Sequence, residues 1–241
     1  MAKIHLFLNA KGGVGKSYIA SIFAQYKIHQ GQKPLCIDTD LVNATFSGYK
    51  ALDVQQFDLG AIDEHGHCNF NHLMGRIPIT HDPVIIDIGA QAFSAMLDYL
   101  GHNKAVELFA GAGHQLIIHT IITGGQSLIS TIDSFLQLLT LRPDNALFVV
   151  WLNPHWGAIE DEGIGFEHMN AYKENKDHIT ALIPIPPLNP ATFGYDLARM
   201  LKDRLTFDEA TSSPTRFIVT RQRLKMIRDG LYRQLNNTVV I

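Results

Sequence analysis

Cysteine is scarce in this sequence, with Cys36 and Cys68 as its two copies among 241 residues. Two cysteines are too few for a disulfide framework, and Cys36 lies in an apolar run typical of a buried strand, which suits a reducing cytosol. Long apolar stretches are missing too, because none approaches the roughly 20 residues that a transmembrane helix needs. We also expect no signal peptide at the N-terminus. We therefore expect a cytoplasmic protein, with peripheral attachment to the inner membrane left open.

Charge of one sign is not in excess either. The net charge of −3 and the pI near 6.4 argue against a generally basic surface that would bind nucleic acid. No low-complexity linker and no internal repeat divides the chain. At 46% apolar and 18% charged residues, 241 residues can build one sizeable core. We therefore predict a single domain that spans residues 1–241.

Short apolar runs alternate with helical patterns along most of the chain. The apolar runs, which predict buried strands, lie at 4–8, 34–38, 83–88, 115–122, 146–152 and 178–186. Helical spacing of apolar residues is found at 17–30, 91–110, 126–141 and 192–204. This alternation predicts an α/β fold, a doubly wound and mainly parallel sheet with helices on both faces. Segments 41–82 and 154–177 carry no clear strand, and we expect surface excursions there.

A glycine-rich segment follows the first predicted strand and opens the first predicted helix. Its residues are Lys11-Gly12-Gly13-Val14-Gly15-Lys16-Ser17. Such a turn presents backbone N–H groups to phosphate oxygens, and its glycines permit a close approach of the backbone. Lys16 can reach the β- and γ-phosphates, and the Ser17 hydroxyl is suited to Mg²⁺. The segment predicts a phosphate loop that binds ATP with Mg²⁺, although Ala10 stands where the common pattern has its first glycine.

Lys11 indicates which class of ATP-binding protein this sequence resembles. The string from Lys11 to Ser17 resembles the deviant Walker A loop of the ParA/MinD family of ATPases. In that family the first lysine reaches across a dimer interface, where a second cation neutralises charge developing on the γ-phosphoryl group. The resemblance implies an ATP-dependent homodimer in which Lys11 acts in trans. Tyr18 belongs to the same nucleotide-binding segment but replaces the small hydroxyl residue that the family usually has after Ser17.

Carboxylates follow two other predicted strands. The segment Cys36-Ile37-Asp38-Thr39-Asp40 resembles the family's D-x-D element, which implies that Asp38 lies near the Mg²⁺ shell and that Asp40 orients the attacking water. The run from Val84 to Gly89 resembles its Walker B strand, which implies that Asp87 holds Mg²⁺ through water and that a γ-phosphate-sensing switch begins at Gly89. The alternative for these carboxylates is a helix cap or a loop anchor.

Two later strand ends resemble the family's base pocket. Asn153 ends one strand, and in this family that side chain hydrogen-bonds the adenine. Pro184 lies in Ile183-Pro184-Ile185-Pro186-Pro187, which resembles the strand end that lines the base pocket. A buried amide that reads a base edge is physically reasonable, because an unmatched base would leave it unpaired. Since Asn before Pro154 is also common in turns, a turn remains the alternative for Asn153.

A stretch at about 216–236 combines basic residues with an apolar stripe. Its cations are Arg216, Arg221, Arg223, Lys225, Arg228 and Arg233. Its apolar residues at helical spacing are Leu224, Ile227, Leu231 and Leu235. One interpretation is a helix packed on the domain with a solvated basic face, and the other is contact with DNA, anionic lipid or an acidic partner. The stripe lacks the bulky aromatic of MinD's membrane-targeting tail, which favours packing.

Four side chains within residues 65–72 could ligate zinc. His65, His67, Cys68 and His72 form a tight cluster in the sequence, but no second cysteine lies nearby. A polar loop is therefore the favoured interpretation of this segment.

Together these features predict a nucleotide-driven dimerisation switch that hydrolyses ATP slowly and under the stimulation of a partner. Within the family the chain most resembles the TraL-type proteins of plasmid conjugation regions. This resemblance implies a protein partner in a conjugation or partition apparatus. Two other classes stay open: a small-molecule enzyme on the same fold, similar to dethiobiotin synthetase, and a non-hydrolysing module whose ATP is structural.

Overall fold

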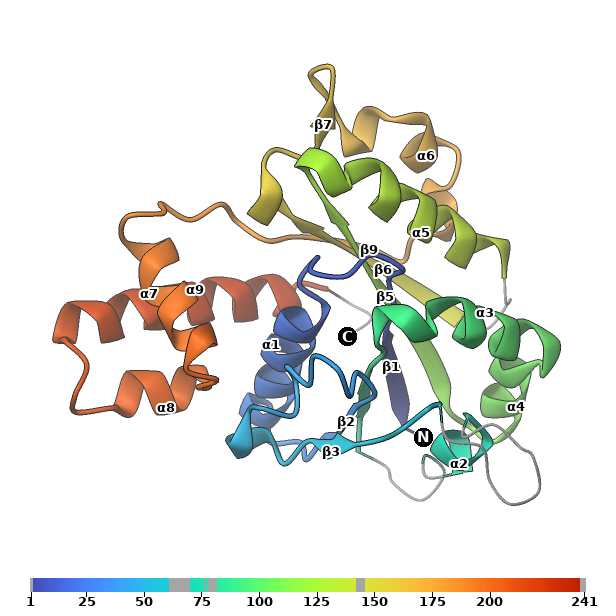
Figure 1. Cartoon of the computed structure of the whole chain (residues 1–241), viewed down its shortest axis with the longest axis horizontal. Coiled ribbons are helices and arrows are strands. Elements are labelled where there is room, and N and C mark those ends of the chain that lie inside the picture. Colours follow the sequence, from blue (N-terminus) through green and yellow to red (C-terminus); the bar gives the residue numbers. More distant parts are fainter. Residues whose placement is uncertain (1, 61–69, 76, 78–81, 142–145, 239–241) are drawn as a thin grey trace.

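The computed structural model describes residues 2–60, 70–75, 77, 82–141 and 146–238. Its centre is a seven-stranded sheet (Figure 1), in which every pair of neighbouring strands is parallel. The strands are β1 (Lys3–Phe7), β2 (Leu35–Asp38), β3 (Gln55–Gln56), β4 (Val84–Asp87), β5 (Gln115–Thr123), β6 (Ala146–Asn153) and β9 (Ala181–Pro184). Their spatial order is β3-β2-β4-β1-β5-β6-β9. The chain thus spreads from β1 to both sides, which confirms the predicted doubly wound sheet.

Helices cover both faces of the sheet. They are α1 (Lys16–His29), α2 (Phe70–Gly75), α3 (Phe93–His102), α4 (Ala105–Gly111), α5 (Leu128–Thr140), α6 (Asn170–Lys173), α7 (Phe193–Lys202), α8 (Phe207–Ser212) and α9 (Ile218–Asn236). One buried cluster joins the sheet to α2–α5, and a second joins it to α1 and α7–α9. Alternate residues of β1 serve the two clusters, with Leu6 in the first and Phe7 in the second. Burial on both faces explains the continuous apolar strands.

The two segments without a predicted strand contain short elements. The edge strand β3 lies in the first, where it pairs with the end of β2. In the second, β7 (Glu160–Asp161) and β8 (Ile164–Gly165) form a separate antiparallel pair. These strands are two residues long, so they are too short to produce an alternating hydrophobic pattern.

The helical pattern at 91–110 divides into two helices. The α3 helix ends at His102, and α4 begins at Ala105. Between them the Asn103 side chain donates to the carbonyl oxygen of Tyr99 at 3.1 Å, and Lys104 has a φ of 46°. The Asn103 backbone N–H donates to the same carbonyl and completes the last turn of α3, and the left-handed Lys104 then turns the chain.

A chain of buried nitrogen atoms lies between the sheet and α1. The Trp151 indole Nε1 donates to Nδ1 of His119 at 3.0 Å, so the His119 proton is on Nε2. That nitrogen lies 2.9 Å from Nδ1 of His5 and donates to it. Burial lowers the pKa of both histidines, that of His119 to about 3. Both imidazoles are therefore neutral, and His5 Nε2 is left without a partner.

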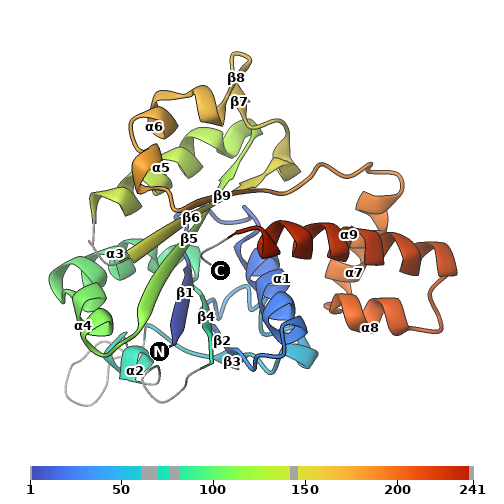
Figure 2. The same cartoon turned by 180° about the vertical axis from the view of Figure 1, so that it is seen from behind.

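Residues 193–236, which we call the C-terminal lobe, contain α7, α8 and α9. Figures 1 and 2 show from opposite sides that this lobe projects from the sheet, with α9 beside α1. The Tyr26 and Tyr232 rings meet edge to face at 5.5 Å between centroids, and the Tyr26 hydroxyl donates to Asn236 Oδ1 at 2.9 Å. None of the helices in the described part of the chain is long and apolar enough to cross a membrane.

Candidate functional site

The site lies where three adjacent strands end. In the parallel register, Asp87 at the end of β4 is opposite Phe7 of β1 on one side and Asp38 of β2 on the other. Because parallel strands end at the same edge of a sheet, the loop after β1 and these two carboxylates come together there. The phosphate loop, residues 11–17, and the carboxylates at 38–40 and 87 therefore share one edge.

Backbone conformation in the phosphate loop explains two of its glycines. Gly13 has a φ of 75° and Gly15 a φ of 99°, values that residues with a Cβ atom rarely adopt. The α1 helix then begins at Lys16, so its first N–H groups face the loop. Val14 is buried, whereas Lys11, Gly12 and Gly13 are exposed. The loop thus has the strand–turn–helix geometry that favours an anion.

Two residues that the sequence did not single out hold the start of the loop. The Asn9 side chain accepts a hydrogen bond from the Lys11 N–H at 2.9 Å and donates to the carbonyl of Ile121 at 2.8 Å. The Ala10 N–H donates to the Ser134 hydroxyl at 3.3 Å. The pattern Asn-x-Lys could have indicated the first contact, since asparagine commonly accepts from the N–H two residues on. The contact with Ser134 depends on the position of α5.

Asn153 contacts the phosphate loop directly. Its Nδ2 donates to the carbonyl of Val14 at 2.9 Å, and its side chain is buried. A Cβ atom on Gly15 would lie 2.7 Å from the same Nδ2, so a larger residue does not fit at Gly15. Pro184, at the end of β9, is exposed and lies opposite Leu152. In this structure Asn153 therefore holds the loop, and base recognition by Asn153 and Pro184 stays a prediction.

Among the carboxyl groups at this edge, that of Asp87 is buried and has a strongly raised pKa. It is 1% exposed, and neither carboxylate oxygen has a hydrogen-bond partner of good geometry. Burial raises its pKa to about 7; the neighbouring Ser17 hydroxyl and Lys16 ammonium oppose that shift, and Asp38 and Asp40 add to it. An unpartnered carboxylate beside a hydroxyl matches the oxygen ligands that Mg²⁺ prefers. Ser17 and Asp87 thus fit the predicted metal site.

Asp38 uses its oxygens differently. Its Oδ1 accepts from the Asp40 N–H at 3.0 Å, and its Oδ2 accepts from the Ser47 N–H at 2.8 Å. Burial raises its pKa, and these backbone bonds oppose the shift. The structure therefore places Asp38 beside Asp87, as expected, but Asp38 also anchors the segment from Asp40 to Ser47. A direct role in holding Mg²⁺ stays a prediction.

Asp40 and Lys16 interact across the site. Asp40 is half-buried, and its Oδ1 accepts from the Asn43 N–H at 2.9 Å. Burial lowers the pKa of the Lys16 ammonium, while the charges of Asp87 and Asp40 raise it. Thr39, between the two aspartates, donates to the Asp87 carbonyl and accepts from the Gly89 N–H, both at 3.1 Å. This threonine, which the sequence did not single out, links the two carboxylate segments.

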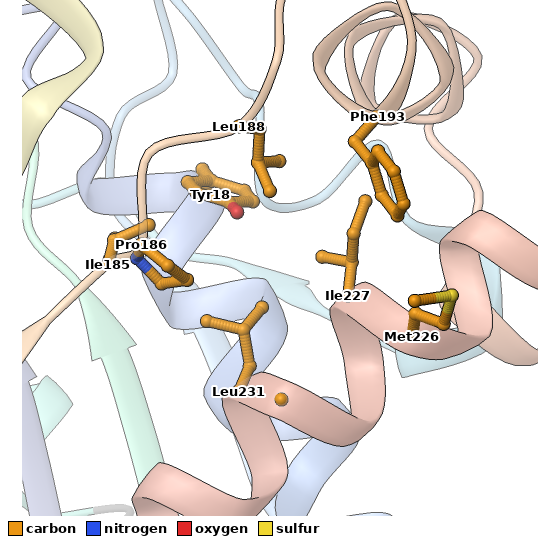
Figure 3. Close-up of a pocket in the computed structure, with 9 residues that line it drawn as sticks. Tyr18, Ile185, Pro186, Leu188, Phe193, Met226, Ile227 and Leu231 are labelled. Carbon is orange, nitrogen blue, oxygen red and sulfur yellow. The ribbon is translucent and has the colours of Figure 1, made fainter.

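Lys11 and Tyr18 lie at the two ends of the loop. Lys11 is exposed, and no described acidic side chain pairs with it. Tyr18 contributes to the wall of an apolar cavity of about 180 Å³ between α1, the 185–188 segment and the C-terminal lobe (Figure 3). The cavity is lined by Tyr18, Ile185, Pro186, Leu188, Phe193, Met226, Ile227, Gly230 and Leu231. Tyr18 thus faces the lobe across this cavity.

The predicted basic face of the C-terminal helix is partly neutralised within the lobe. Arg216 pairs with Asp203 at 2.9 Å, Arg223 with Asp196 at 3.1 Å, and Arg228 with both Asp208 at 3.1 Å and Asp229 at 2.9 Å. Across the whole lobe nine Lys and Arg residues still outnumber five Asp and Glu residues. The start of α9 also exposes large apolar side chains, with Phe217 at 84% and Ile218 at 74%.

The zinc alternative finds no support in the described part of the chain. His65, His67 and Cys68 lie outside the described residues. Among those that are described, no group of three His, Cys, Asp or Glu side chains is placed to hold a metal ion.

Comparisons with known proteins agree with this geometry. No protein-family model matches the sequence. The protein TraL of Escherichia coli is 52% identical over 241 residues, which cover the whole of both chains. Among solved structures, the septum site-determining protein MinD of Pyrococcus horikoshii, in complex with Mg-ADP, aligns over 100% of both chains with a TM-score of 0.54 and 16% identity. A chain of the MinC:MinD cell division protein complex of Aquifex aeolicus aligns over 99% of this chain and 97% of its own, with a TM-score of 0.53 and 14% identity.

The two kinds of likeness support different statements. At 14–16% identity the solved structures show the fold alone, which is that of the MinD/ParA-type P-loop NTPases. The 52% identity over complete chains shows the family. This chain therefore belongs to the TraL family, on a P-loop NTPase fold of the MinD/ParA type.

Proposed function

We propose that this protein is an ATP-binding dimerisation switch of the ParA/MinD type, which hydrolyses ATP slowly to ADP and phosphate. The observation that carries the proposal is the buried carboxylate of Asp87, which lies beside Ser17 and Lys16 but has no hydrogen-bond partner of good geometry. Leaving such a group unpaired costs about 1–3 kcal/mol, so a ligand that completes it is the simplest reason to retain it. MinD of P. horikoshii, which has this fold, was solved with Mg-ADP.

Each predicted residue has a distinct role in this proposal. Lys16 and the loop amides bind the phosphates, and Ser17 and Asp87 hold Mg²⁺, with Asp38 beside them. When bound, Mg²⁺ neutralises charge on the phosphate oxygens. Asp40 orients the attacking water from the edge of the site. Asn153 and Pro184 lie on the side proposed for the base.

Lys11 is the residue that we propose to contact the second subunit. Its side chain is exposed and free of acidic partners in the described chain, so it is available to a neighbouring molecule. In a homodimer that forms around ATP, Lys11 of each subunit would neutralise charge on the nucleotide of the other. Hydrolysis removes the γ-phosphate from that contact, and the dimer then comes apart.

The proposed biological setting is plasmid conjugal transfer or partition, as the resemblance to TraL-type proteins implies. The protein would act in the cytoplasm with a protein partner that stimulates hydrolysis. The cationic excess of the C-terminal lobe and the exposed Phe217 and Ile218 support a contact with anionic lipid at the inner membrane better than one with DNA, because apolar side chains gain little from a phosphate backbone.

Size-exclusion chromatography with light scattering tests the switch. The wild type should be a monomer without nucleotide or with ADP and a dimer with ATP and Mg²⁺. Lys11→Ala should stay monomeric with ATP yet bind Mg-ADP like the wild type, because Lys11 acts on the other subunit. Lys33→Ala, an exposed lysine away from the loop, is the matched control and should dimerise.

Two results would contradict the proposal. A wild type that stays monomeric with ATP, or a Lys11→Ala variant that dimerises and hydrolyses normally, is incompatible with a trans-acting lysine. Turnover that requires a small acid or amine cosubstrate would instead favour the small-molecule enzyme on the same fold.

A further inference from the structure

Trp156 contacts the phosphate loop from the surface. It ends the short 3-10 turn Pro154–Trp156 that follows β6, and its side chain is 50% exposed. Its indole Nε1 donates to the carbonyl of Gly13 at 3.1 Å. Trp151, the other tryptophan, is fully buried and donates to His119. Core packing does not explain Trp156, because half of its side chain is exposed while its indole donates to a loop carbonyl.

The turn that carries Trp156 is held in place by backbone contacts. A Cβ atom on Gly125 would lie 2.5 Å from the Trp156 carbonyl oxygen, and one on Gly124 would clash with the carbonyl of Ala158. Only glycines at these positions let the two turns approach so closely. At the base of the turn, the Thr123 hydroxyl donates to the Asn153 carbonyl at 2.7 Å. The backbone that carries Trp156 thus packs closely against the turn at Gly124 and Gly125.

Trp156 and Asn153 hold successive carbonyls of the loop. Trp156 binds the carbonyl of Gly13, and Asn153 binds that of Val14. In a trans peptide the C=O and the following N–H point in opposite directions. The two contacts therefore orient the N–H groups of Val14 and Gly15 away from Trp156 and Asn153. Within the described chain neither N–H donates to an acceptor, so both are free for an anion.

We propose that Trp156 is a positioning residue of the phosphate loop, which keeps the Val14 N–H directed at a bound diphosphate. This inference rests on the proposed function, since it presumes that the loop binds phosphate. Successive N–H groups on one concave side form an anion-binding nest, whose strength depends on how little it must reorganise. Without the indole donor, the Gly13–Val14 peptide is free to rotate, and each binding event must order it again.

The size of the effect follows from one hydrogen bond. A neutral hydrogen bond contributes about 1 kcal/mol, which corresponds to roughly fivefold in a dissociation constant. Trp156→Phe keeps an aromatic ring over the loop and removes only the N–H donor. We therefore expect it to raise the Kd for Mg-ADP about fivefold. Because the side chain is half-exposed and makes one polar contact, the free energy of unfolding should change little.

Isothermal titration calorimetry with the full-length protein tests this role. Mg-ADP and Mg-pyrophosphate are titrated into wild type, Trp156→Phe and Trp156→Ala. Tyr195→Phe, which changes an aromatic residue that is 57% exposed on α7, is the matched control and should bind like the wild type. In the Trp156 variants we expect the Kd to rise by the same factor for both ligands, because pyrophosphate retains the contacts with the loop amides. Denaturation in urea checks that folding is unchanged.

The outcomes separate this inference from the proposed function. Wild type that binds neither Mg-ADP nor Mg-pyrophosphate overturns the proposed function and this inference with it. Wild-type binding with a Kd less than twofold changed in both Trp156 variants overturns the inference alone. Weakening confined to Mg-ADP would also overturn it, because Trp156 would then act on the nucleoside. Equal weakening for both ligands, with unchanged unfolding, supports the assignment.

Discussion

Replacing Asp87 by asparagine should stabilise the protein in the absence of Mg²⁺, although Asp87 lies at the centre of the proposed site. Burial raises its pKa from 3.8 to about 7. Between about pH 4 and pH 7 the unfolded chain releases this proton while the folded chain retains it. Stability therefore falls as the pH rises through this window and levels off above pH 7. Asparagine has nearly the same shape and no charge to bury, so the stability of the variant does not fall as the pH rises through this window.

The magnitude follows from the size of the pKa shift. A shift from 3.8 to about 7 corresponds to about 4 kcal/mol as an upper bound. The asparagine amide would itself lack partners in this site, and an unsatisfied buried polar group costs about 1–3 kcal/mol. We therefore expect Asp87→Asn to be about 2 kcal/mol more stable than the wild type at pH 8, and to lose this advantage at pH 4.5, where the wild-type carboxyl is protonated.

Urea denaturation in EDTA at pH 4.5 and pH 8 measures this difference. Asp98→Asn, which neutralises an exposed aspartate on α3, is the control and should stay within about 0.5 kcal/mol of the wild type at both pH values. Adding Mg-ADP at pH 8 should stabilise the wild type more than Asp87→Asn, because the ligand then completes the carboxylate. A variant less stable than the wild type at pH 8, or a difference that does not change with pH, would refute the reasoning about charge burial.

Two further predictions concern the core and the C-terminal lobe. The pKa of His119 is lowered from 6.5 to about 3, so the unfolded chain takes up this proton first as the pH falls, and stability is lost below about pH 6.5. Between pH 7 and pH 5 the wild type should lose about 2 kcal/mol more unfolding free energy in urea than His119→Gln, whereas the exposed His102→Gln should match the wild type; equal losses in all three would contradict burial of a neutral imidazole. In flotation with anionic vesicles, Phe217→Ser with Ile218→Ser should reduce lipid binding at least threefold, while Leu108→Ser, an exposed apolar residue on α4, should not. Binding to neutral vesicles at the same level, or no binding at all, would exclude the lipid contact.

The phosphate loop and the strand-end carboxylates could be predicted because their constraints are local. Gly13 and Gly15 adopt positive φ angles that other residues rarely tolerate, so their spacing in the sequence reports the turn. Asp38 and Asp87 end apolar runs, and parallel strands bring such ends to one edge regardless of the details of packing. The fold class followed from the same alternation of runs. Strands of two residues, such as β3, leave no such trace.

Local pattern cannot say which polar atoms bind each other once the chain is folded. Asn153 and Trp156 bind loop carbonyls that are 139 and 143 positions away in the chain. Arg223 and Arg228 read as a free basic face, yet their partners are Asp196 on α7 and Asp208 on α8.

The sequence thus predicted which residues gather at this edge of the sheet, whereas the fold decided what supports the loop. The spacing of the glycines, and the lysine and hydroxyl at the start of the helix, all lie within a few consecutive residues, so their pattern is visible in the sequence. Hydrogen bonds and ion pairs need atoms within about 3 Å, and only the packing of β6 beside β5 brings Trp156 to Gly13. Asp87 combines both cases: its position follows from the strand pattern, and its raised pKa follows from burial that the folded chain creates.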